Sequence, residues 1–476
     1  MSDNFEMVIG LEVHVQLNTV SKAFCGDENR FGVDPNSLVS AISLAHPGTL
    51  PRLNEAQILK AIRLGLSLGG RINSTSTFDR KNYFYPDLPK GYQITQDRVP
   101  IVVGGAMDIK DRSLRLHHIH MEEDAGKLIH DLDDTFSLVD LNRAGVPLLE
   151  IVTEPDFRTA SEVEIFLERL RQLVRWLDVS DGNMEEGSMR CDVNLSLRPF
   201  GQEAYGNRCE IKNLNSMRFA KQAIAYERKR QAGILNAGGT IQQQTLNFDP
   251  ESGITTPLRD KEEAHDYRYF PDPDLPPMVI SNTKIDEIKS QMPELPLALK
   301  ERWNREYKIV EKDADVLIQS KERALKCQEW LIDSKDPKLL SQFLVNKIIP
   351  YAKESKKELT ELTLSSEKLN EFLELILSEQ VASSKAYQVL FPKWVENPDQ
   401  DIQLLAKKLG VIHDNNMDAM TTVINELIAN HPKELEAYRG GKEQLLGFFM
   451  GQLMRMEGVK ANPKLAKDLM IKVLNS

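Results

Sequence analysis

The sequence has few cysteines and no long apolar run, and these absences exclude several classes of protein. Its four cysteines lie far apart in 476 residues without a C-x-x-C pair, which argues against a disulfide scaffold and against a sequence-visible zinc site. No stretch approaches the roughly 18 to 20 apolar residues that span a bilayer. The acidic N-terminus resembles neither a signal peptide nor a transit peptide. We therefore expect a soluble, cytoplasmic protein without membrane contact.

The signatures of common nucleotide and hydrolase sites are also missing. Gly126-Lys127 lacks the preceding glycine and the following Ser or Thr of a P-loop, and no G-x-G-x-x-G follows a predicted strand. The run from His117 to Lys127 is not an H-E-x-x-H helix, which disfavours a zinc hydrolase. Cys25 has no neighbouring base, so we do not interpret it as a glutamine-attacking nucleophile. Any ATP site must therefore be unconventional.

The overall charge is unfavourable for non-specific nucleic-acid binding. The formal net charge is -11 and the pI is near 5.5, whereas neutralisation of phosphates by Lys and Arg dominates that kind of affinity. The C-terminal part is locally basic and includes Arg439, Lys442, Arg455 and Lys460. Most such charge runs are only solvated faces, but a tRNA partner would need a local patch of this kind.

The style of the sequence changes near Pro293 to Pro296. Before that point, short alternating runs with frequent Gly and Pro predict a sheet-rich part, and long Leu-, Lys- and Glu-rich stretches after it predict helices. A weaker boundary falls around Trp394 to Gln400. We predict an α+β fold in three parts, with residues 1–295, 296–405 and 406–476.

Three segments of the first part alternate between apolar and polar residues. Met7 to Leu17 places Glu12, His14 and Gln16 on one face, opposite an apolar face. The same alternation groups Arg190, Asp192, Asn194 and Ser196, and it also groups Arg208, Glu210 and Lys212. A half-exposed antiparallel sheet produces this pattern for structural reasons alone. The types of charge nevertheless favour a functional face.

The densest chemical segment runs from His117 to Lys127. If this segment is a strand, His120, Glu122 and Asp124 face one way, which is costly unless a cation balances the charges. Carboxylates with one imidazole suit magnesium or manganese. Glu150 lies inside the apolar run from Pro147 to Val152, where it is either a salt-bridged structural acid or a further ligand.

Other segments have structural interpretations as well as functional ones. The period between Thr159 and Leu177 predicts a core helix, with Ser161 and Glu164 as a capping box. The segments 79–93 and 266–271 mix charged and aromatic side chains. Such a mixture suits stacking on a nucleotide or a tRNA end, although aromatic loops pack on their own domain at least as often.

Several long motifs resemble those of the B-subunit family of the tRNA-dependent amidotransferase GatCAB. The likeness extends into the C-terminal part, which is similar to a YqeY-type tail. The motifs that carry it are 9–14, 80–93, 120–127, 142–147, 184–192, 210–213, 438–442, 447–452 and 461–463. They follow one another in the family's order over essentially the whole chain.

The resemblance implies a cradle-shaped catalytic domain, a helical domain and a small helical, tRNA-binding tail. It also implies an ATP-dependent carbon–nitrogen ligase that uses Mg²⁺. The side-chain carboxylate of Glu-tRNA(Gln) and/or Asp-tRNA(Asn) would be phosphorylated, because a carboxylate alone is a poor acyl donor, and ammonia would then displace the phosphate. A glutaminase A subunit would supply the ammonia, and a small C subunit would complete the complex.

The resemblance also implies roles for individual residues. The expected metal ligands are His14, Glu122 and Glu150; the surrounding catalytic acids are Glu12, Glu123, Asp124, Asp192 and Glu210; the ammonia passage or acceptor-end contacts are Lys81, Tyr83, Asp87 and Lys90; and the tRNA contacts are Arg439, Lys442, Arg455 and Lys460. Some relatives bind zinc through cysteine pairs near the start. Cys25 is single here, so we predict no zinc.

Two other interpretations compete with catalysis. The chain could be a non-catalytic tRNA-binding adaptor in which the acidic sheet only folds. It could also be a free-standing metal-dependent hydrolase, which the missing zinc motif disfavours. The two alternatives differ from the catalytic interpretation in whether ATP turnover depends on Glu122.

Overall fold

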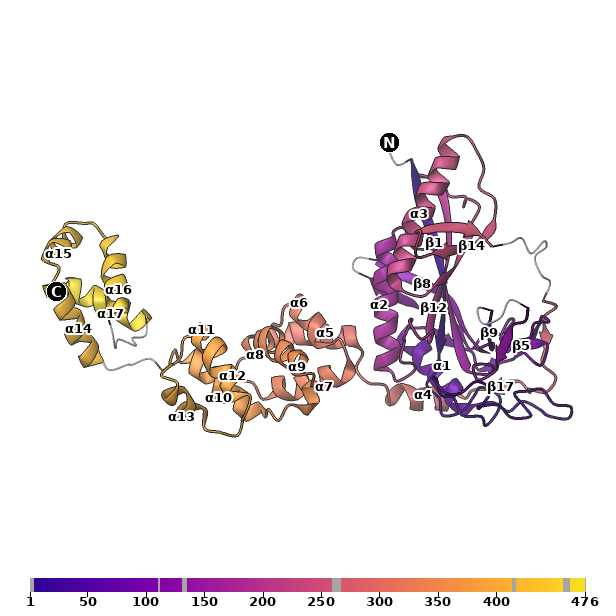
Figure 1. The fold of residues 1–476 in the computed structure, drawn as a ribbon, viewed down its shortest axis with the longest axis horizontal. Helices are drawn as coiled ribbons and strands as arrows, with labels where there is room; N and C mark the ends of the chain where they lie inside the picture. Colours follow the sequence, from indigo (N-terminus) through magenta and orange to yellow (C-terminus); the bar gives the residue numbers. More distant parts are fainter. Residues whose placement is uncertain are drawn as a thin grey trace. The chain divides into compact units, whose positions relative to one another are not determined.

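The chain folds into two compact units, Met1–Pro296 and Leu297–Ser476 (Figure 1). The computed structural model describes residues 4–109, 112–130, 135–258, 267–412, 417–456 and 463–475. Strands predominate in the first unit and helices make up the second, which confirms the predicted α+β class. The three-part division remains a prediction. Within the described ranges, no helix has the length and apolarity needed to cross a bilayer.

A large sheet organises the first unit. Among the described residues its order is β15-β14-β13-β12-β1-β11-β8-β6-β2, with β7 paired to β8. Neighbouring strands are antiparallel except β13 and β14. The strands are β1 Phe5–Gln16, β2 Arg71–Ile72, β6 Val102–Val103, β7 Ala106–Ile109, β8 Arg112–Glu123, β11 Pro147–Thr153, β12 Met189–Pro199, β13 Cys209–Leu214, β14 Gln244–Asp249 and β15 Ile254–Pro257.

Smaller sheets lie beside the large one. Strands β4 Asp79–Asn82, β5 Tyr92–Thr95 and β16 Phe270–Pro271 form one of them. Strand β9 Lys127–Ile129 pairs with β10 Leu138–Asp140, and β3 Thr75–Ser76 pairs with β17 Met278–Val279. The charged and aromatic segments of the sequence therefore meet in one sheet, since β16 pairs with β4.

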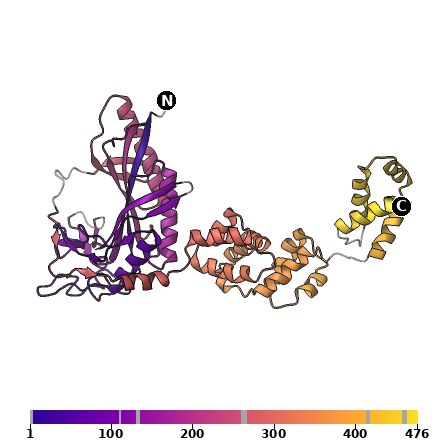
Figure 2. The same ribbon diagram turned by 180° about the vertical axis from the view of Figure 1, so that it is seen from behind.

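Among the residues that the structure describes, helices cover one face of the large sheet. They are α1 Glu55–Ser67, α2 Ala160–Trp176 and α3 Met217–Asn236, and Figures 1 and 2 show α2 and α3 side by side along it. The odd-numbered residues of β1, such as Leu11 and Val13, are buried in the same core as Phe166 of α2. The even-numbered residues therefore face the other side, which confirms the predicted alternation.

The N-terminal cap of α2 differs from the prediction. Ser161 and Glu164 were predicted as the capping box, but Thr159 is the cap: Glu162 N donates to Thr159 Oγ1 at 3.1 Å, and Thr159 N donates to Glu162 Oε2 at 2.9 Å. The sequence contains both T-x-x-E and S-x-x-E, two residues apart. Because Thr159 adopts the extended backbone that a cap requires and Ser161 already lies inside the helix, the earlier box forms.

After α4 Asn282–Ser290, the second unit consists of short helices. They are α5 Pro296–Tyr307, α6 Glu311–Leu317, α7 Lys321–Ile332, α8 Pro337–Phe343, α9 Ile349–Glu354, η2 Leu359–Glu361, α10 Ser366–Leu377, α11 Ser383–Lys385, α12 Phe391–Trp394, α13 Ile402–Lys408, α14 Met417–Ala429, α15 Pro432–Arg439, α16 Leu445–Arg455 and α17 Pro463–Asn475. Two π-helical segments, η1 Leu344–Ile348 and η3 Ala386–Leu390, each lie just before a proline, Pro350 or Pro392. Proline lacks the N–H of a regular helix, which accounts for the wider turn at both places.

The last four helices enclose a core of their own. Phe449 and Leu453 of α16 are fully buried there with Met470 and Leu474 of α17 and Ile424 of α14. Phe449 and Leu453 are four residues apart, so α16 presents one apolar face to this core. Helix α17 begins at Pro463.

Candidate carboxylate and metal site

Strand pairing arranges charged residues in rows across the uncovered face of the sheet. His14 is paired with Glu150 on one side and with Arg190 on the other, and Glu150 is paired with His120. Residues directly opposite in antiparallel strands project to the same face. These four side chains therefore form one row over β12, β1, β11 and β8, and Glu12 opposite Asp192 begins the next row.

The three predicted metal ligands lie together, and we call them the inner cluster. His14, Glu122 and Glu150 each offer a ligand atom within 4.8 Å of the others. His14 Nε2 lies 3.4 Å from Glu150 Oε2 and 3.7 Å from Glu122 Oε1. His120 Nε2 approaches the same two carboxylates, at 3.1 Å from Glu150 and 3.6 Å from Glu122. Thr95 Oγ1 donates to Glu122 at 3.3 Å.

Electrostatics in the inner cluster follow from burial and close pairing. Burial alone would lower the pKa of His120, but the carboxylates of Glu122 and Glu150 outweigh it and raise the pKa to about 10. The pKa of His14 is raised for the same reason. Burial would raise the pKa of Glu150, and the two imidazoles instead bring it well below its usual value. The carboxylates thus require positive charge, which protons or a metal ion can supply.

A second group of acids lies beside it, and we call Glu12, Asp192 and Glu210 the outer cluster. Each offers an oxygen within 4.8 Å of the others. Lys212 Nζ lies 3.0 Å from Glu210 Oε1 and 3.4 Å from Asp192 Oδ2. Burial raises the pKa of Glu12, and the carboxylates of Glu150 and Glu210 raise it further. Burial is also the main cause of the raised pKa of Asp192. Three acids share one lysine, so this cluster would also gain from a cation.

The structure does not bring the other two predicted acids into either cluster. Glu123 is 1% exposed and accepts from Lys90 Nζ at 2.5 and 2.6 Å and from Ile94 N at 3.0 Å. Asp124 follows the end of β8, yet it lines the same cavity as Glu122, so the two carboxylates face one way as the alternation predicted. Asp124 accepts from Arg190 Nη2 at 2.9 Å. Although burial opposes ionisation, Arg190 and Arg143 lower the pKa of Asp124.

The inner cluster and Asp192 of the outer cluster line one cavity of about 550 Å³, which we call the carboxylate cavity. Cationic side chains line it with the acids. They are Lys81, Arg190 and Lys212. Sequence reasoning placed Arg190 and Lys212 on polar faces but did not select them as site residues. Alternation in the sequence showed which face of its strand each residue occupies. It did not show which strands are neighbours, so it could not place the two residues beside the acids.

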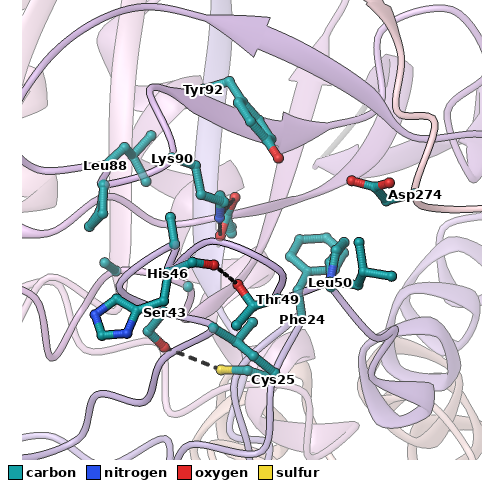
Figure 3. A pocket seen from close by; sticks show the side chains of 17 residues that line it. Phe24, Cys25, Ser43, His46, Thr49, Leu50, Leu88, Lys90, Tyr92 and Asp274 are labelled. Carbon is teal, nitrogen blue, oxygen red and sulfur yellow. Dashed lines mark hydrogen bonds and ion pairs between the residues drawn. The ribbon is translucent and has the colours of Figure 1, made fainter.

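A smaller cavity of about 240 Å³ lies next to Lys90, and we call it the Lys90 cavity. Figure 3 shows Cys25 and Ser43, whose Sγ and Oγ are 3.4 Å apart, across the cavity from Lys90 and Tyr92. Glu123 lines this cavity, whereas its neighbours Glu122 and Asp124 line the carboxylate cavity. The end of β8 therefore lies between the two cavities, and the Lys90–Glu123 ion pair lies on the side of the Lys90 cavity.

Of the remaining predicted passage residues, Lys81 lies in β4, and Tyr83 and Asp87 lie in the loop between β4 and Lys90. Lys81 Nζ lies 4.8 Å from the centroid of the Tyr267 ring, and the Tyr83 ring contacts the same ring edge to face at 6.5 Å. Burial raises the pKa of Tyr83. The Asp87 carbonyl accepts from Gly126 N at 2.8 Å, which fixes this loop against the segment after β8.

A third cavity, of about 380 Å³, lies beside the outer cluster and shares Glu12 with it. We call it the Tyr205 cavity. Gly10, Glu12, Asn194, Tyr205 and Arg208 are among the residues that line it. Asn194 Nδ2 donates to Glu12 Oε1 at 2.9 Å and so connects the cavity to the outer cluster. A Cβ on Gly206 would lie 2.2 Å from the Leu197 carbonyl oxygen, so only glycine lets the 205–208 loop pack this closely on β12.

The predicted tRNA contacts of the tail differ in their surroundings. Arg439, Lys442 and Arg455 are exposed. Arg439 Nε donates to the Leu474 carbonyl at 2.9 Å, which connects α15 to α17. Lys460 lies outside the described residues.

Known proteins match the chain along nearly its whole length. Residues 7–286 match the GatB/GatE catalytic domain, and residues 327–474 match the GatB domain. A protein of Persephonella marina is 44% identical over 99% of both chains. Proteins of Prosthecochloris aestuarii and Syntrophotalea carbinolica are each 45% identical, over 98% and 100% of this chain and 97% and 99% of their own. All three are named as the B subunit of an aspartyl/glutamyl-tRNA(Asn/Gln) amidotransferase.

Proposed function

The chain belongs to the GatB/GatE family, and from this premise we propose that it is the carboxylate-activating subunit of a tRNA-dependent amidotransferase. It phosphorylates the side-chain carboxylate of Glu-tRNA(Gln) and/or Asp-tRNA(Asn) with ATP, and ammonia then displaces the phosphate to give the amide. A glutaminase A subunit supplies the ammonia, and a small C subunit completes the complex.

The observation that carries this proposal is the pair of acidic clusters on one open face of the sheet. The inner cluster offers two carboxylates and one imidazole, a donor set that suits Mg²⁺. The raised pKa values of Glu12 and Asp192 indicate that the outer acids also lack positive charge. Mg²⁺ bound to such residues would offset the charge of the phosphoryl group during transfer.

The residues around the clusters have complementary tasks. Arg190 and Lys212 line the carboxylate cavity and offer positive charge to phosphate oxygens. Glu122 and Glu150 hold His14 and His120 in place through the contacts described above. The odd-numbered residues of β1 and β12 are apolar and buried in the core, so water cannot reach the site from the helix-covered face of the sheet.

We assign the adenosine of ATP to the Tyr205 cavity. Its volume of about 380 Å³ lies within the usual range of small-molecule sites. It shares Glu12 with the outer cluster, so a triphosphate leaving the cavity reaches the acids directly. The Tyr205 ring, which is 63% exposed, offers an aromatic surface for stacking.

The ammonia passage follows from the two cavities at the end of β8. The Lys90 cavity, which the Lys90–Glu123 ion pair lines, and the carboxylate cavity lie on either side of the end of β8. Ammonia from the A subunit would enter the first and reach the activated acyl group in the second. Lys81, which lines the carboxylate cavity, is at the receiving end.

The decisive experiment measures ATP hydrolysis and amide formation by the reconstituted three-subunit complex on Glu-tRNA(Gln), with Mg²⁺ present or removed. Glu122→Ala is expected to abolish both reactions while tRNA binding is retained, because the carboxylate lies in the inner cluster. The matched control is Glu168→Ala, which removes an exposed acid of α2 on the covered side of the sheet. Full activity of Glu122→Ala would contradict the proposal and favour an adaptor. Metal-dependent hydrolysis that requires no ATP would favour a hydrolase.

A further inference from the structure

Three histidines of β8 form a line from the protein surface to the inner cluster. His117 Nδ1 lies 2.6 Å from His118 Nδ1, and His118 Nε2 lies 3.0 Å from His120 Nδ1. His120 Nε2 completes the line at 3.1 Å from Glu150 Oε2. His117 is exposed, His118 is half-buried and His120 is only 8% exposed.

A β-bulge explains how two adjacent histidines reach each other. In the pairing of β8 with β11, His118 opposes Val152 but Leu116 opposes Thr153. His117 is therefore the extra residue, and bulges commonly re-aim a side chain beside a functional site. His118 keeps the regular register, so it projects to the same face as His120. Their rings stack with centroids 5.1 Å apart.

The hydrogen-bonding capacity of histidine suits this position. Each contact joins two ring nitrogens, so one of them must donate and the other must accept. His120 Nε2 lies against carboxylates and therefore donates. A neutral His118 can present its Nε2 to His120 Nδ1 as an N–H or as a lone pair. Burial and the neighbouring imidazoles lower the pKa of His118 to about 4, so it is neutral at neutral pH.

We propose that His118 is a positioning residue for the inner cluster. It holds the ring of His120 so that Nε2 stays directed at Glu150 and Glu122. The two carboxylates then keep the orientation in which, with His14, they can bind a divalent cation. The inference requires no change of protonation and rests on the proposed function, because it takes the inner cluster as the metal site. Removal of comparable outer partners typically costs about 10- to 100-fold in metal affinity.

The test measures Mn²⁺ binding to the full-length chain by electron paramagnetic resonance, with Mn²⁺ alone as the probe. His118→Leu is expected to weaken binding at the inner cluster roughly 10-fold. His118→Gln is expected to retain most of the affinity, because its side-chain amide can accept from His120 Nδ1 through the oxygen or donate to it through the nitrogen. The matched control is His117→Gln, which changes the exposed neighbour and leaves the contact between His118 and His120.

Three outcomes would overturn the role of His118. They are unchanged Mn²⁺ affinity in His118→Leu, equal losses in the Leu and Gln variants, and an equal loss in His117→Gln. The thermal unfolding midpoint of each variant separates lost positioning from lost folding. Glu150→Gln identifies the inner site in wild-type protein. If Glu150→Gln leaves Mn²⁺ binding unchanged, the inner cluster is not the metal site. The role of His118 would then be contradicted because there is no site for it to position, and not because its own variants behave differently from expectation.

Discussion

Glu122 and Glu123 are adjacent in β8 but face different cavities, because successive residues of a strand project to opposite sides. Glu122 belongs to the inner cluster, and Glu123 is almost fully buried against Lys90. The sequence motif identified both acids as candidate site residues. No local pattern indicates that β5 contacts both of them, Glu123 through Ile94 and Glu122 through Thr95.

The ion pair of Lys90 with Glu123 gives the first prediction. Lys90→Met leaves a buried carboxylate without its cation, so we expect a loss of about 3 kcal/mol in the free energy of unfolding. Urea denaturation measures the loss, and the double variant with Glu123→Gln should recover most of it. The matched control is Lys393→Met, which removes an exposed pair with Glu396 and should cost less than about 1 kcal/mol. Equal losses in the two lysine variants would contradict the prediction.

Cys25 leads to the expectation that the protein binds no stoichiometric zinc. Burial raises the pKa of its thiol, and zinc binding requires the thiolate. Metal analysis of chelator-washed protein should therefore find zinc well below one atom per chain, in wild type and in Cys25→Ser alike. One zinc per wild-type chain that is lost in Cys25→Ser would contradict this expectation.

At the scale of strands and helices, the sequence predicted which face of a strand a side chain occupies better than it predicted which strands pair. Alternation correctly placed Glu12 and His14 on one side of β1 and Asp192 on one side of β12. It could not indicate that β1 lies between β11 and β12, because that pairing joins segments more than 100 residues apart. The bulge at His117 was equally inaccessible, since it exists only relative to β11.

Strand β1 also carries the test of the adenosine assignment. Gly10 has no positive φ, and a Cβ there would meet its nearest neighbour, Pro155, at an ordinary 3.7 Å. Gly10→Val therefore fits the strand but fills the floor of the Tyr205 cavity. We expect KM for ATP to rise at least about 10-fold, with Mn²⁺ binding unchanged. Gly10→Ala is the matched control. Unchanged KM in the Val variant would remove adenosine from this cavity.

Helix α3 is connected to the sheet by a buried acid with a predictable pH dependence. Glu227 accepts from Arg230 Nη2 at 2.5 Å and from Thr255 Oγ1 of β15 at 2.9 Å. Burial opposes ionisation, but these partners lower its pKa below the ordinary 4.5. Its stabilisation is thus complete above pH 4.5 and is lost as pH falls through the lower folded-state pKa. Glu227→Gln should reduce stability at pH 7 and flatten its decline on acidification. Parallel wild-type and mutant stability curves between pH 6 and 3 would contradict this.

At the scale of the whole molecule, charge is unevenly distributed along the chain. The net charge of -11 belongs to the full sequence, whereas the last four helices display exposed Lys442 and Arg455 around a core of their own. A part with its own core can be removed without exposing the core of the first unit, which consists of other residues. The basic tail and its tRNA contacts stay a prediction from the sequence, and Lys460 lies outside the described residues.

Truncation after Ile412 tests whether this tail binds the body of the tRNA. The cut keeps the bridge of Ile412 with Val381 and removes α14 to α17. In the reconstituted complex, we expect tRNA affinity to fall at least about 10-fold while tRNA-independent glutaminase activity is retained, because contacts to phosphates dominate such affinity. Lys442→Gln with Arg455→Gln in the intact chain is the finer test. If both residues contact phosphates, the slope of log affinity against log salt decreases by about two. Unchanged affinity after truncation would contradict tRNA binding by the tail and place the tRNA contacts in the first 412 residues or in the partner subunits.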